Sequence, residues 1–306
     1  MATIKFGTDG VRGRAYEDLS LADAFLIGRA AADVFGGTTA VIGRDTRESG
    51  PALTAALAAG LAAGGIEALD LGVAPTPAVA FVAGQRGAVG AVVSASHNPW
   101  FDNGIKLFSP QGSKLGDADQ AAVEARLGQL DPSLAIVEPS QTIASIQSEV
   151  GGWVQAVRSS IDVDLTGIHV VVDCAHGAAS HVVAPALADL GAQVTPMFNQ
   201  PDGRNINEAC GSTYPQSLAK AVVDADADIG LALDGDADRL LAVDHMGTVI
   251  DGDQIMAMLA LDMDQRGLLA GSQLVVTVMS NLGLLRSMDA AGISVEVTPV
   301  GDRNVL

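Results

Sequence analysis

The sequence predicts an α/β protein made of successive three-layer domains with parallel or mixed sheets. A strand, a helix, a glycine stop and a second strand follow one another in the same order at three places along the 306 residues. Strands joined through a helix usually run parallel, so each repeat predicts a βαβ crossover with helices covering the sheet. The predicted domains span residues 1–150, 151–248 and 249–306, and the last of them is expected to be incomplete.

The first repeat has clear helix boundaries. Ser49 is the expected N-cap, and Pro51 suits the first helical turn because the missing amide proton is not needed there. Gly64 and Gly65 are expected to end the helix. The predicted elements of this repeat are a strand at 39–43, a helix at 49–63 and a strand at 66–71.

The second and third repeats have the same order, with helix stops expected at Gly191 and Gly292. Between the first two repeats, residues 111–148 are expected to be helical and acidic. The predicted elements are strands at 168–173 and 193–198 around a helix at 176–190, then strands at 274–279 and 293–297 around a helix at 280–291.

Bulk composition limits the choice of partners. The chain has 36 acidic and 17 basic residues, a formal net charge of −19, which argues against binding to nucleic acid. Neither a signal peptide nor a bilayer span is expected, since the Ala/Gly-rich stretch at 52–65 is too short and too broken to cross a membrane. The two cysteines, Cys174 and Cys210, indicate no disulfide framework, so the cytoplasm is the default compartment.

The first candidate site is a polar turn, Ser-Ala-Ser-His-Asn-Pro at 94–99, that follows an apolar strand at 91–93. Pro99 cannot continue a strand ladder, so polar groups are presented just beyond a buried strand, where α/β proteins keep their chemistry. Lys106 follows ten residues after Ser96, carried by Asp102–Ile105, which we expect to form a tight turn.

The second candidate site is Asp-Gly-Asp-Ala-Asp-Arg at 234–239, directly after an apolar strand at 230–233. Carboxylates at alternate positions point the same way along an extended chain, and three such oxygens suit a hard cation such as Mg²⁺. An EF-hand is excluded because its sixth position would be Arg239 instead of glycine. The equally spaced aspartates at 224–228 lack a preceding strand and a glycine, so we expect a solvated helix end there.

These segments together resemble the α-D-phosphohexomutases, and most of all the phosphoglucosamine mutase branch. The resemblance covers nearly the whole chain and is carried by FGTDGVRG at 6–13, SASHNP with DNGIK at 94–106, DGDADR at 234–239 and VGDR at 300–303. It implies an isomerase that interconverts glucosamine 6-phosphate and glucosamine 1-phosphate, on the way to UDP-N-acetylglucosamine and cell-wall precursors. The implied intermediate is glucosamine 1,6-bisphosphate.

The resemblance also implies roles for individual residues. Ser96 would carry the phosphoryl group, and Lys106 would act as general acid/base with help from His97. That role would need a lysine pKa lowered by burial or neighbouring cations. Arg12 would face the phosphoserine, and Arg239 would contact phosphate. One Mg²⁺ would be held by Ser96, Asp234, Asp236 and Asp238, and substrate would be bound by Gly301, Asp302 and Arg303.

Where the chain ends matters under this resemblance. The rest of the third domain and the whole fourth domain, which carry the family's sugar-hydroxyl and second phosphate loops, do not follow Leu306. We therefore expect the 306 residues to bind Mg²⁺ but to show little mutase turnover.

Several alternatives stay open. Within the superfamily, the chain could be a phosphomannomutase or a phosphoglucomutase, or a non-catalytic remnant that binds sugar phosphate and Mg²⁺. A metal-dependent hydrolase using Ser96 with a histidine is a further option, although adjacent Ser96 and His97 are poorly placed as nucleophile and base, and no G-x-S-x-G elbow is present. The oligomeric state is left open, with a homodimer among the options.

Overall fold

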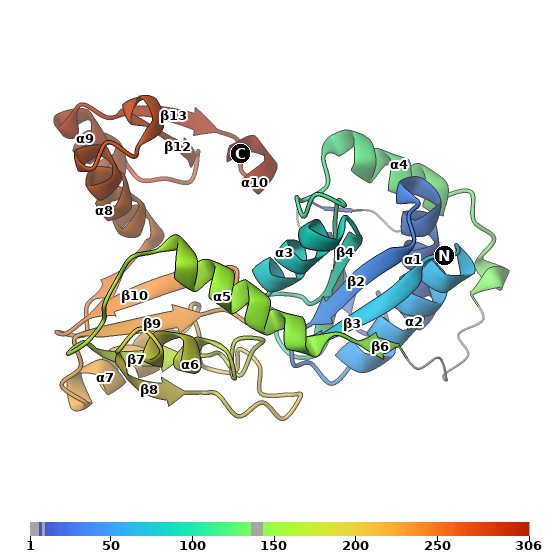
Figure 1. The fold of residues 1–306 in the computed structure, drawn as a ribbon, viewed down its shortest axis with the longest axis horizontal. Coiled ribbons are helices and arrows are strands. Elements are labelled where there is room, and N and C mark those ends of the chain that lie inside the picture. Colours follow the sequence, from blue (N-terminus) through green and yellow to red (C-terminus); the bar gives the residue numbers. More distant parts are fainter. Residues whose placement is uncertain (1–5, 8–9, 136–142, 306) are drawn as a thin grey trace.

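The computed structural model describes residues 6–7, 10–135 and 143–305. In this part of the chain the strands form three sheets, of six, five and two strands, which follow one another along the sequence (Figure 1). The first two sheets contain both parallel and antiparallel neighbours. The predicted α/β class with mixed sheets is confirmed.

The first unit is built on the six-stranded sheet, in the order β1-β5-β4-β2-β3-β6. The three neighbours β4, β2 and β3 run parallel, whereas β5 is antiparallel to both β4 and β1. The strands are β1 (Val11–Arg14), β2 (Thr39–Arg44), β3 (Glu67–Val73), β4 (Val89–Val93), β5 (Asp102–Phe108) and β6 (Ala144–Ser145). The helices are α1 (Leu21–Phe35), α2 (Gly50–Ala63), α3 (Thr76–Arg86) and α4 (Asp117–Leu127).

Helices cover both faces of this sheet because its central strands are apolar on both sides. In β2, Ile42 belongs to the core that includes α1 and α2, whereas its neighbour Val41 belongs to the core that includes α3. The same alternation occurs in β4 between Val93 and Val92. This alternation is the expected two-residue period of a strand. Residues of one strand therefore contribute to two separate apolar cores.

The second unit is built on the five-stranded sheet, in the order β11-β10-β9-β7-β8. Its central pair, β7 and β9, is parallel, and β9 continues into the aspartate-rich segment at 234–239. The strands are β7 (His169–Asp173), β8 (Gln193–Met197), β9 (Ile229–Leu233), β10 (Leu240–Asp244) and β11 (Val249–Ile250), and the helices are α6 (Val183–Ala188) and α7 (Gln216–Asp224).

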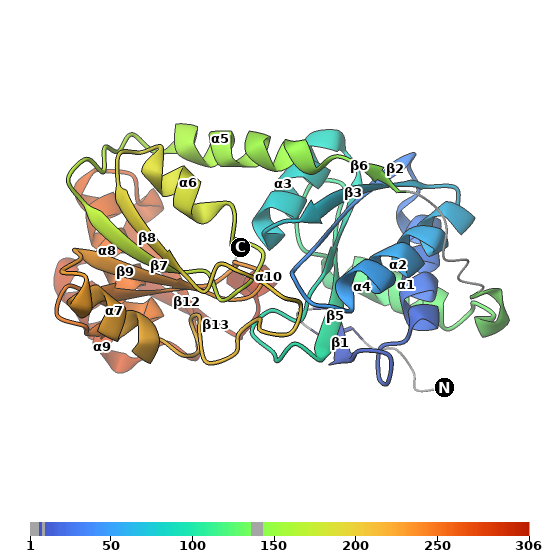
Figure 2. The ribbon, with the colours of Figure 1, turned by 90° about the horizontal axis from the view of Figure 1, so that it is seen from below.

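Helix α5 (Val150–Ser160) joins the first two units. Figures 1 and 2 both show it running from the first sheet to the second, and in Figure 2 it lies along the upper edge of the molecule. At its start, Val150 and Trp153 pack into the α3 core of the first unit. Further along, Val154 and Val157 line a cavity with α6 of the second unit. The helix therefore contacts both units, and it places their carboxyl-end loops within reach of one another.

The third unit contains the parallel strand pair β12 and β13, packed against helices. Its core includes Val276, Leu284 and Met288. Its elements are α8 (Gly252–Gln265), β12 (Gln273–Thr277), α9 (Leu282–Ala291), β13 (Ser294–Thr298) and α10 (Asp302–Val305). None of the helices in the described residues is both long and apolar enough to cross a membrane.

The prediction of a tight turn at Asp102–Ile105 is wrong, because these residues begin strand β5. The chain turns earlier, within residues 96–101. Gly104 pairs with Arg12 of β1, and a Cβ on Gly104 would lie 2.6 Å from the Ser94 carbonyl oxygen. The glycine therefore serves a close approach of two backbones within the sheet, and it does not mark a reversal of the chain.

The predicted helix at 176–190 is reduced to α6, which spans Val183–Ala188. Ala175 and His176 have positive φ angles of 53° and 49°, which end the strand in a left-handed turn and prevent an early helix start. Ser49 does precede α2, but its side chain makes no cap hydrogen bond and instead accepts one from Asn103 at 2.8 Å. In the region predicted to be helical at 111–148, the described residues hold the longer helix α4, short turns and the two-residue strand β6.

The contact between α1 and α2 yields a test of packing. A Cβ on Gly60 of α2 would lie 1.9 Å from the carbonyl oxygen of Phe25 in α1. We expect Gly60→Ala to destabilise the protein by about 1–3 kcal/mol through overpacking. Gly152→Ala in α5 is the matched control, because a Cβ there meets no atom within 4 Å and alanine favours helix by up to about 1 kcal/mol. Urea unfolding measures both, and equal stability changes would contradict the packing.

Candidate functional site

The candidate site forms where two loops from different units meet. The serine loop, residues 94–101, follows β4 of the first unit, and the aspartate loop, residues 234–239, follows β9 of the second. The Ser96 hydroxyl donates a hydrogen bond of 2.6 Å to Asp234 Oδ2 across the boundary. Ser96 and Asp234 are both buried. The two segments that the sequence singles out are thus brought into direct contact.

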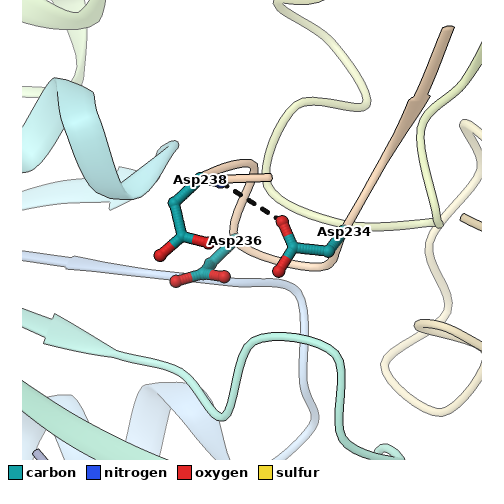
Figure 3. Close-up of side chains that lie close together, drawn as sticks. All are labelled: Asp234, Asp236 and Asp238. Carbon is teal, nitrogen blue, oxygen red and sulfur yellow. Dashed lines mark hydrogen bonds between the residues drawn. The ribbon is translucent and has the colours of Figure 1, made fainter. Parts of the chain in front are cut away.

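The aspartate loop curls instead of running straight. The chain turns at residues 235–237, and Ala237 has a positive φ of 56°. The amides of Asp238 and Arg239 both donate to Asp234 Oδ1, each at 3.2 Å. The carboxylates do converge as expected, but the expected reason, an extended chain with alternate side chains on one side, is wrong. The three carboxylates converge because the loop bends back on itself (Figure 3).

Gly235 allows the backbones of the two loops to touch. A Cβ at this position would lie 2.6 Å from the Ser96 carbonyl oxygen and 2.9 Å from Asn207 Nδ2. Real Cβ atoms do not approach other atoms so closely. Any larger residue at 235 would therefore push the aspartate loop away from the serine loop.

Lys106 supplies the positive charge inside the carboxylate cluster. Its side chain projects from β5 and is buried, with Nζ 2.7 Å from Asp236 Oδ2 and 3.2 Å from Asp238 Oδ2. Burial acts to lower the pKa of Lys106, but Asp236 and Asp238 outweigh it and the pKa is raised. The lowered lysine pKa that the acid/base role was expected to need is not found in this arrangement, and Lys106 is a charged ammonium here.

Thr76, at the first position of α3, holds the same aspartate from another side. Its hydroxyl donates to Asp236 Oδ2 at 2.6 Å, and its amide donates to the Asp236 carbonyl oxygen at 2.9 Å. Asp236 is therefore fixed by both its main chain and its side chain. Thr76 carries no chemical pattern in the sequence, because a Thr-Pro pair is an ordinary helix start.

The carboxylates of Asp234, Asp236 and Asp238 offer ligand atoms that all lie within 4.8 Å of one another. Burial, and next the charges of Asp236 and Asp238, raise the pKa of Asp234 to about 7. Burial acts to raise the pKa of Asp236 as well, but the neighbouring Lys106 ammonium keeps it below its ordinary value. Asp236 Oδ1 is buried and has no hydrogen-bond partner among the described residues.

These observations match the needs of a hard divalent cation. Carboxylate oxygens are its preferred ligands, and a cation would both offset the like-charge repulsion and give Asp236 Oδ1 a partner. The second aspartate triplet, at 224–228, provides the contrast. It lies at the exposed end of α7, with Asp226 at φ 49°, so the predicted solvated helix end is confirmed.

Two further candidate residues border the serine. His97 Nδ1 lies 3.4 Å from Ser96 Oγ and 3.0 Å from Arg239 Nη1. Burial, then the charges of Arg239 and Arg12, lower the pKa of His97, which keeps its imidazole neutral near pH 7. Because Ser96 donates to Asp234 and not to His97, a serine–histidine nucleophile pair is not formed. Arg12 lies on β1 beside β5 and acts on His97 through its charge.

The third-unit candidates are Gly301, Asp302 and Arg303. Within the described part of the structure, no hydrogen bond links the third unit to Ser96. Gly301 has a φ of 133° and directly precedes α10. The side chains of Asp302 and Arg303 lie outside the described part of the structure. In Figures 1 and 2, α10 lies on the side of the third unit that is nearest to the first unit.

Sequence reasoning missed two polar side chains that hold the serine loop. Arg47 follows β2 in the first unit, and Asn207 lies in a loop of the second unit. Both donate to the carbonyl oxygens of Ser96 and Asn98. Their residue types gave no signal, because contacts to backbone carbonyls leave no pattern in the sequence.

Comparison with known proteins gives a consistent result. Family profiles described as phosphoglucomutase/phosphomannomutase alpha/beta/alpha domains I, II and III match residues 3–133, 152–247 and 251–306. A phosphoglucosamine mutase from Pelotomaculum thermopropionicum is 50% identical over 312 residues, covering 99% of this chain and 70% of the relative. A phosphoglucosamine mutase from Rhodococcus erythropolis is 48% identical over 309 residues, covering 98% and 69%.

Solved structures agree with the sequence relatives. The crystal structure of a phosphoglucomutase/phosphomannomutase family protein from Burkholderia thailandensis superposes with a TM-score of 0.83 at 28% identity. The superposition covers 100% of this chain and 68% of that protein.

The contact between the two loops can be tested at Gly235. We expect Gly235→Ala to separate the aspartate loop from the serine loop, since the added methyl group would collide with the Ser96 carbonyl oxygen. Amide hydrogen exchange in residues 94–101 should rise in this variant. Gly252→Ala, where a Cβ meets nothing within 4 Å, should leave that exchange unchanged. Unaltered exchange in Gly235→Ala would mean that the two backbones do not touch in solution.

Proposed function

The chain belongs to the phosphoglucosamine mutase family, and we propose that Ser96 is the residue that takes up and returns the phosphoryl group. Members of this family are isomerases that act by phosphoryl transfer. The observation that carries the proposal is the 2.6 Å hydrogen bond from the Ser96 hydroxyl to Asp234, inside a cluster of carboxylates whose oxygens suit a hard cation. Ser94 is the alternative hydroxyl, but it donates to Asp45 at 2.6 Å and not to one of the three clustered aspartates.

The proposed substrate is a hexosamine monophosphate, and the intermediate is glucosamine 1,6-bisphosphate. When the bisphosphate phosphorylates the protein, a bond forms between Ser96 Oγ and phosphorus, and the bond from phosphorus to the sugar oxygen breaks. The departing sugar oxygen takes a proton from the charged Lys106, and the serine proton restores the ammonium. In the opposite step, phosphorylated Ser96 gives its phosphoryl group to the free hydroxyl of a hexosamine monophosphate, which forms the bisphosphate and leaves Ser96 unphosphorylated.

One Mg²⁺ is proposed at Asp234, Asp236 and Asp238, with an oxygen of Ser96 as a further ligand. When bound, the ion supplies positive charge beside the transferring phosphoryl group. Support comes from Asp236 Oδ1, which has no hydrogen-bond partner in the described part of the chain, and from the convergence of hard oxygen ligands. Lys106, which balances these carboxylates here, would then be available to the substrate.

The remaining positive groups have proposed roles as phosphate partners. Arg12 and Arg239 flank His97, and their guanidinium groups can each make paired hydrogen bonds to a phosphate. The neutral His97 would assist by accepting or donating a hydrogen bond at Ser96. Gly301, Asp302 and Arg303 are proposed to contact the sugar. We further propose a cytoplasmic location, in keeping with the buried free thiols of Cys174 and Cys210.

Phosphorylation of Ser96 is tested by intact mass after incubation with glucosamine 1,6-bisphosphate and Mg²⁺. The wild-type chain should gain the mass of one phosphoryl group, and Ser96→Ala should gain none. Ser94→Ala is the matched control and should still be phosphorylated, because its hydroxyl only supports the loop. Phosphate that persists in Ser96→Ala, or that maps to Ser94, would overturn the proposal.

Metal binding is tested with the middle aspartates of the two equally spaced triplets, Asp236 and Asp226. Asp236→Asn should weaken Mg²⁺ binding by about tenfold or more, which is about 1.4 kcal/mol, because a charged ligand becomes neutral. Asp226→Asn, in the exposed triplet at the end of α7, should leave the affinity unchanged. Titration calorimetry measures both. Similar losses in the two variants would show that spacing alone does not define the site.

A further inference from the structure

The guanidinium of Arg47 is enclosed by the serine loop. The residue is 1% exposed, and its Nε donates to Asp45 Oδ2 at 2.8 Å. The other two nitrogens donate to main-chain oxygens of one short segment. The acceptors are the carbonyl oxygens of Ser96, Asn98, Pro99 and Asp102. Five hydrogen bonds therefore join one side chain to the serine loop, to the first residue of β5 and to its own carboxylate partner.

This arrangement needs an arginine. A buried charge costs several kcal/mol of lost hydration unless it is paired and its donors are satisfied. Asp45 pairs the charge, and the planar guanidinium reaches acceptors on two sides at once. A lysine has a single charged nitrogen with three donors, so it could not bond to the carboxylate and to four carbonyl oxygens together.

Asn207 reaches the same loop from the second unit. Its Nδ2 donates to the Ser96 carbonyl oxygen at 2.8 Å and to the Asn98 carbonyl oxygen at 3.1 Å. Each of these two oxygens also accepts from Arg47 Nη2 at 2.9 Å. Two side chains from different units thus share the same pair of acceptors, and we name Arg47 and Asn207 the carbonyl clamp.

The clamp acts on a strained residue. Ser96 has a φ of 54°, in the left-handed region, where a non-glycine residue costs roughly 1–2 kcal/mol. Its amide donates to Ser94 Oγ at 2.9 Å, and its carbonyl oxygen is held by the clamp. With both ends of the residue fixed, its hydroxyl is directed at Asp234.

We propose that Arg47 and Asn207 are positioning residues for phosphoryl transfer at Ser96. Arg47 sets the shape of the serine loop within the first unit. Asn207 sets the position of that loop against the aspartate loop of the second unit. Neither side chain needs to touch substrate or metal for this purpose. The inference rests on the proposed function of Ser96, and it assigns to the loop around Asn207 a part in the reaction that the sequence did not indicate.

The test measures the initial rate of Ser96 phosphorylation by intact mass, over a range of glucosamine 1,6-bisphosphate concentrations with Mg²⁺ present. Asn207→Asp keeps the size of the side chain but replaces its donor with an acceptor that faces two carbonyl oxygens. We expect the maximal rate to fall about 10- to 100-fold, the scale of a misplaced reacting group. The half-saturating bisphosphate concentration and the Mg²⁺ affinity should stay within about twofold, because Asn207 is proposed to contact neither the substrate nor the metal.

Matched controls separate positioning from folding. Asn205 lies in the same loop, and its side chain accepts from the Asp202 amide and donates to the Gln200 carbonyl oxygen. Asn205→Ala should therefore keep the wild-type rate. Arg47→Lys should lower the maximal rate about 100-fold or more. Arg44→Lys is its control and should keep the wild-type rate, because Arg44 pairs with Asp70 at 2.9 Å and is not part of the carbonyl clamp. Thermal unfolding is recorded for each variant. If Arg47→Lys fails to fold, Asn207→Asp and Asn207→Ala decide the question.

The outcomes are distinguishable. Wild-type protein that gains no phosphate at Ser96 would overturn the proposed function, and the clamp with it. Wild-type protein that is phosphorylated while Asn207→Asp matches its rate would overturn the clamp alone. A parallel fall in Mg²⁺ affinity would also overturn it, since Asn207 would then act through the aspartate loop. A reduced maximal rate with unchanged half-saturation and unchanged melting temperature would support it.

Discussion

The site depends on three carboxylates held close together in a largely buried place. Two unit charges about 4 Å apart interact by about 4 kcal/mol at an effective dielectric constant near 20, so this repulsion needs a nearby cation. Lys106 provides it, from a strand of the first unit to aspartates of the second. The attraction crosses the same boundary as the bonds from Thr76 and Ser96. Charge and hydrogen bonding at the site therefore help to set the relative position of the two units, together with helix α5.

The same balance explains how an acidic protein can bind an anionic substrate. The formal net charge of −19 would repel a sugar phosphate at long range. Salt screens such forces beyond about 10 Å at 0.1 M ionic strength, so the charges close to the site decide. Lys106, Arg12 and Arg239 all act on the residues around Ser96. A cation held by the aspartates would add to this local positive field without changing the character of the remaining surface.

Much of the fold could be predicted from local pattern, because strands and helix ends depend on neighbouring residues. The apolar runs that became β2, β4, β7 and β9 were found at nearly the observed bounds, and Gly292 ends α9 in a left-handed cap as expected. Local pattern failed where distant chain segments decide. Asp102–Ile105 has turn composition but pairs with β1, and Ser49 has the type of an N-cap but bonds to Asn103.

The site residues likewise fall into those that the sequence predicts and those that it does not. Ser96, Lys106 and the aspartates at 234–238 were found because their residue types and spacing carry a chemical pattern, and the structure brings them together. Their roles and the position of the sugar contacts stay proposals. Arg47, Thr76 and Asn207 could not be found, because each acts on groups that lie far away in the sequence. Main-chain oxygens occur at every residue, so a side chain that bonds to them needs only to be brought near by the fold, and its residue type does not reveal the contact.

The conformation of Ser96 explains why the serine loop needs partners from distant parts of the sequence. A flexible glycine would adopt the left-handed conformation at position 96 without strain, but it would bring no hydroxyl. A serine brings the hydroxyl and the strain together, so other parts of the structure must hold it in place. Donors directed at carbonyl oxygens are suited to this, because they fix the main chain while leaving the side chain of Ser96 free to reach Asp234. The need to hold one strained residue thus accounts for a fully buried arginine beside the site and for an asparagine that reaches across from the second unit.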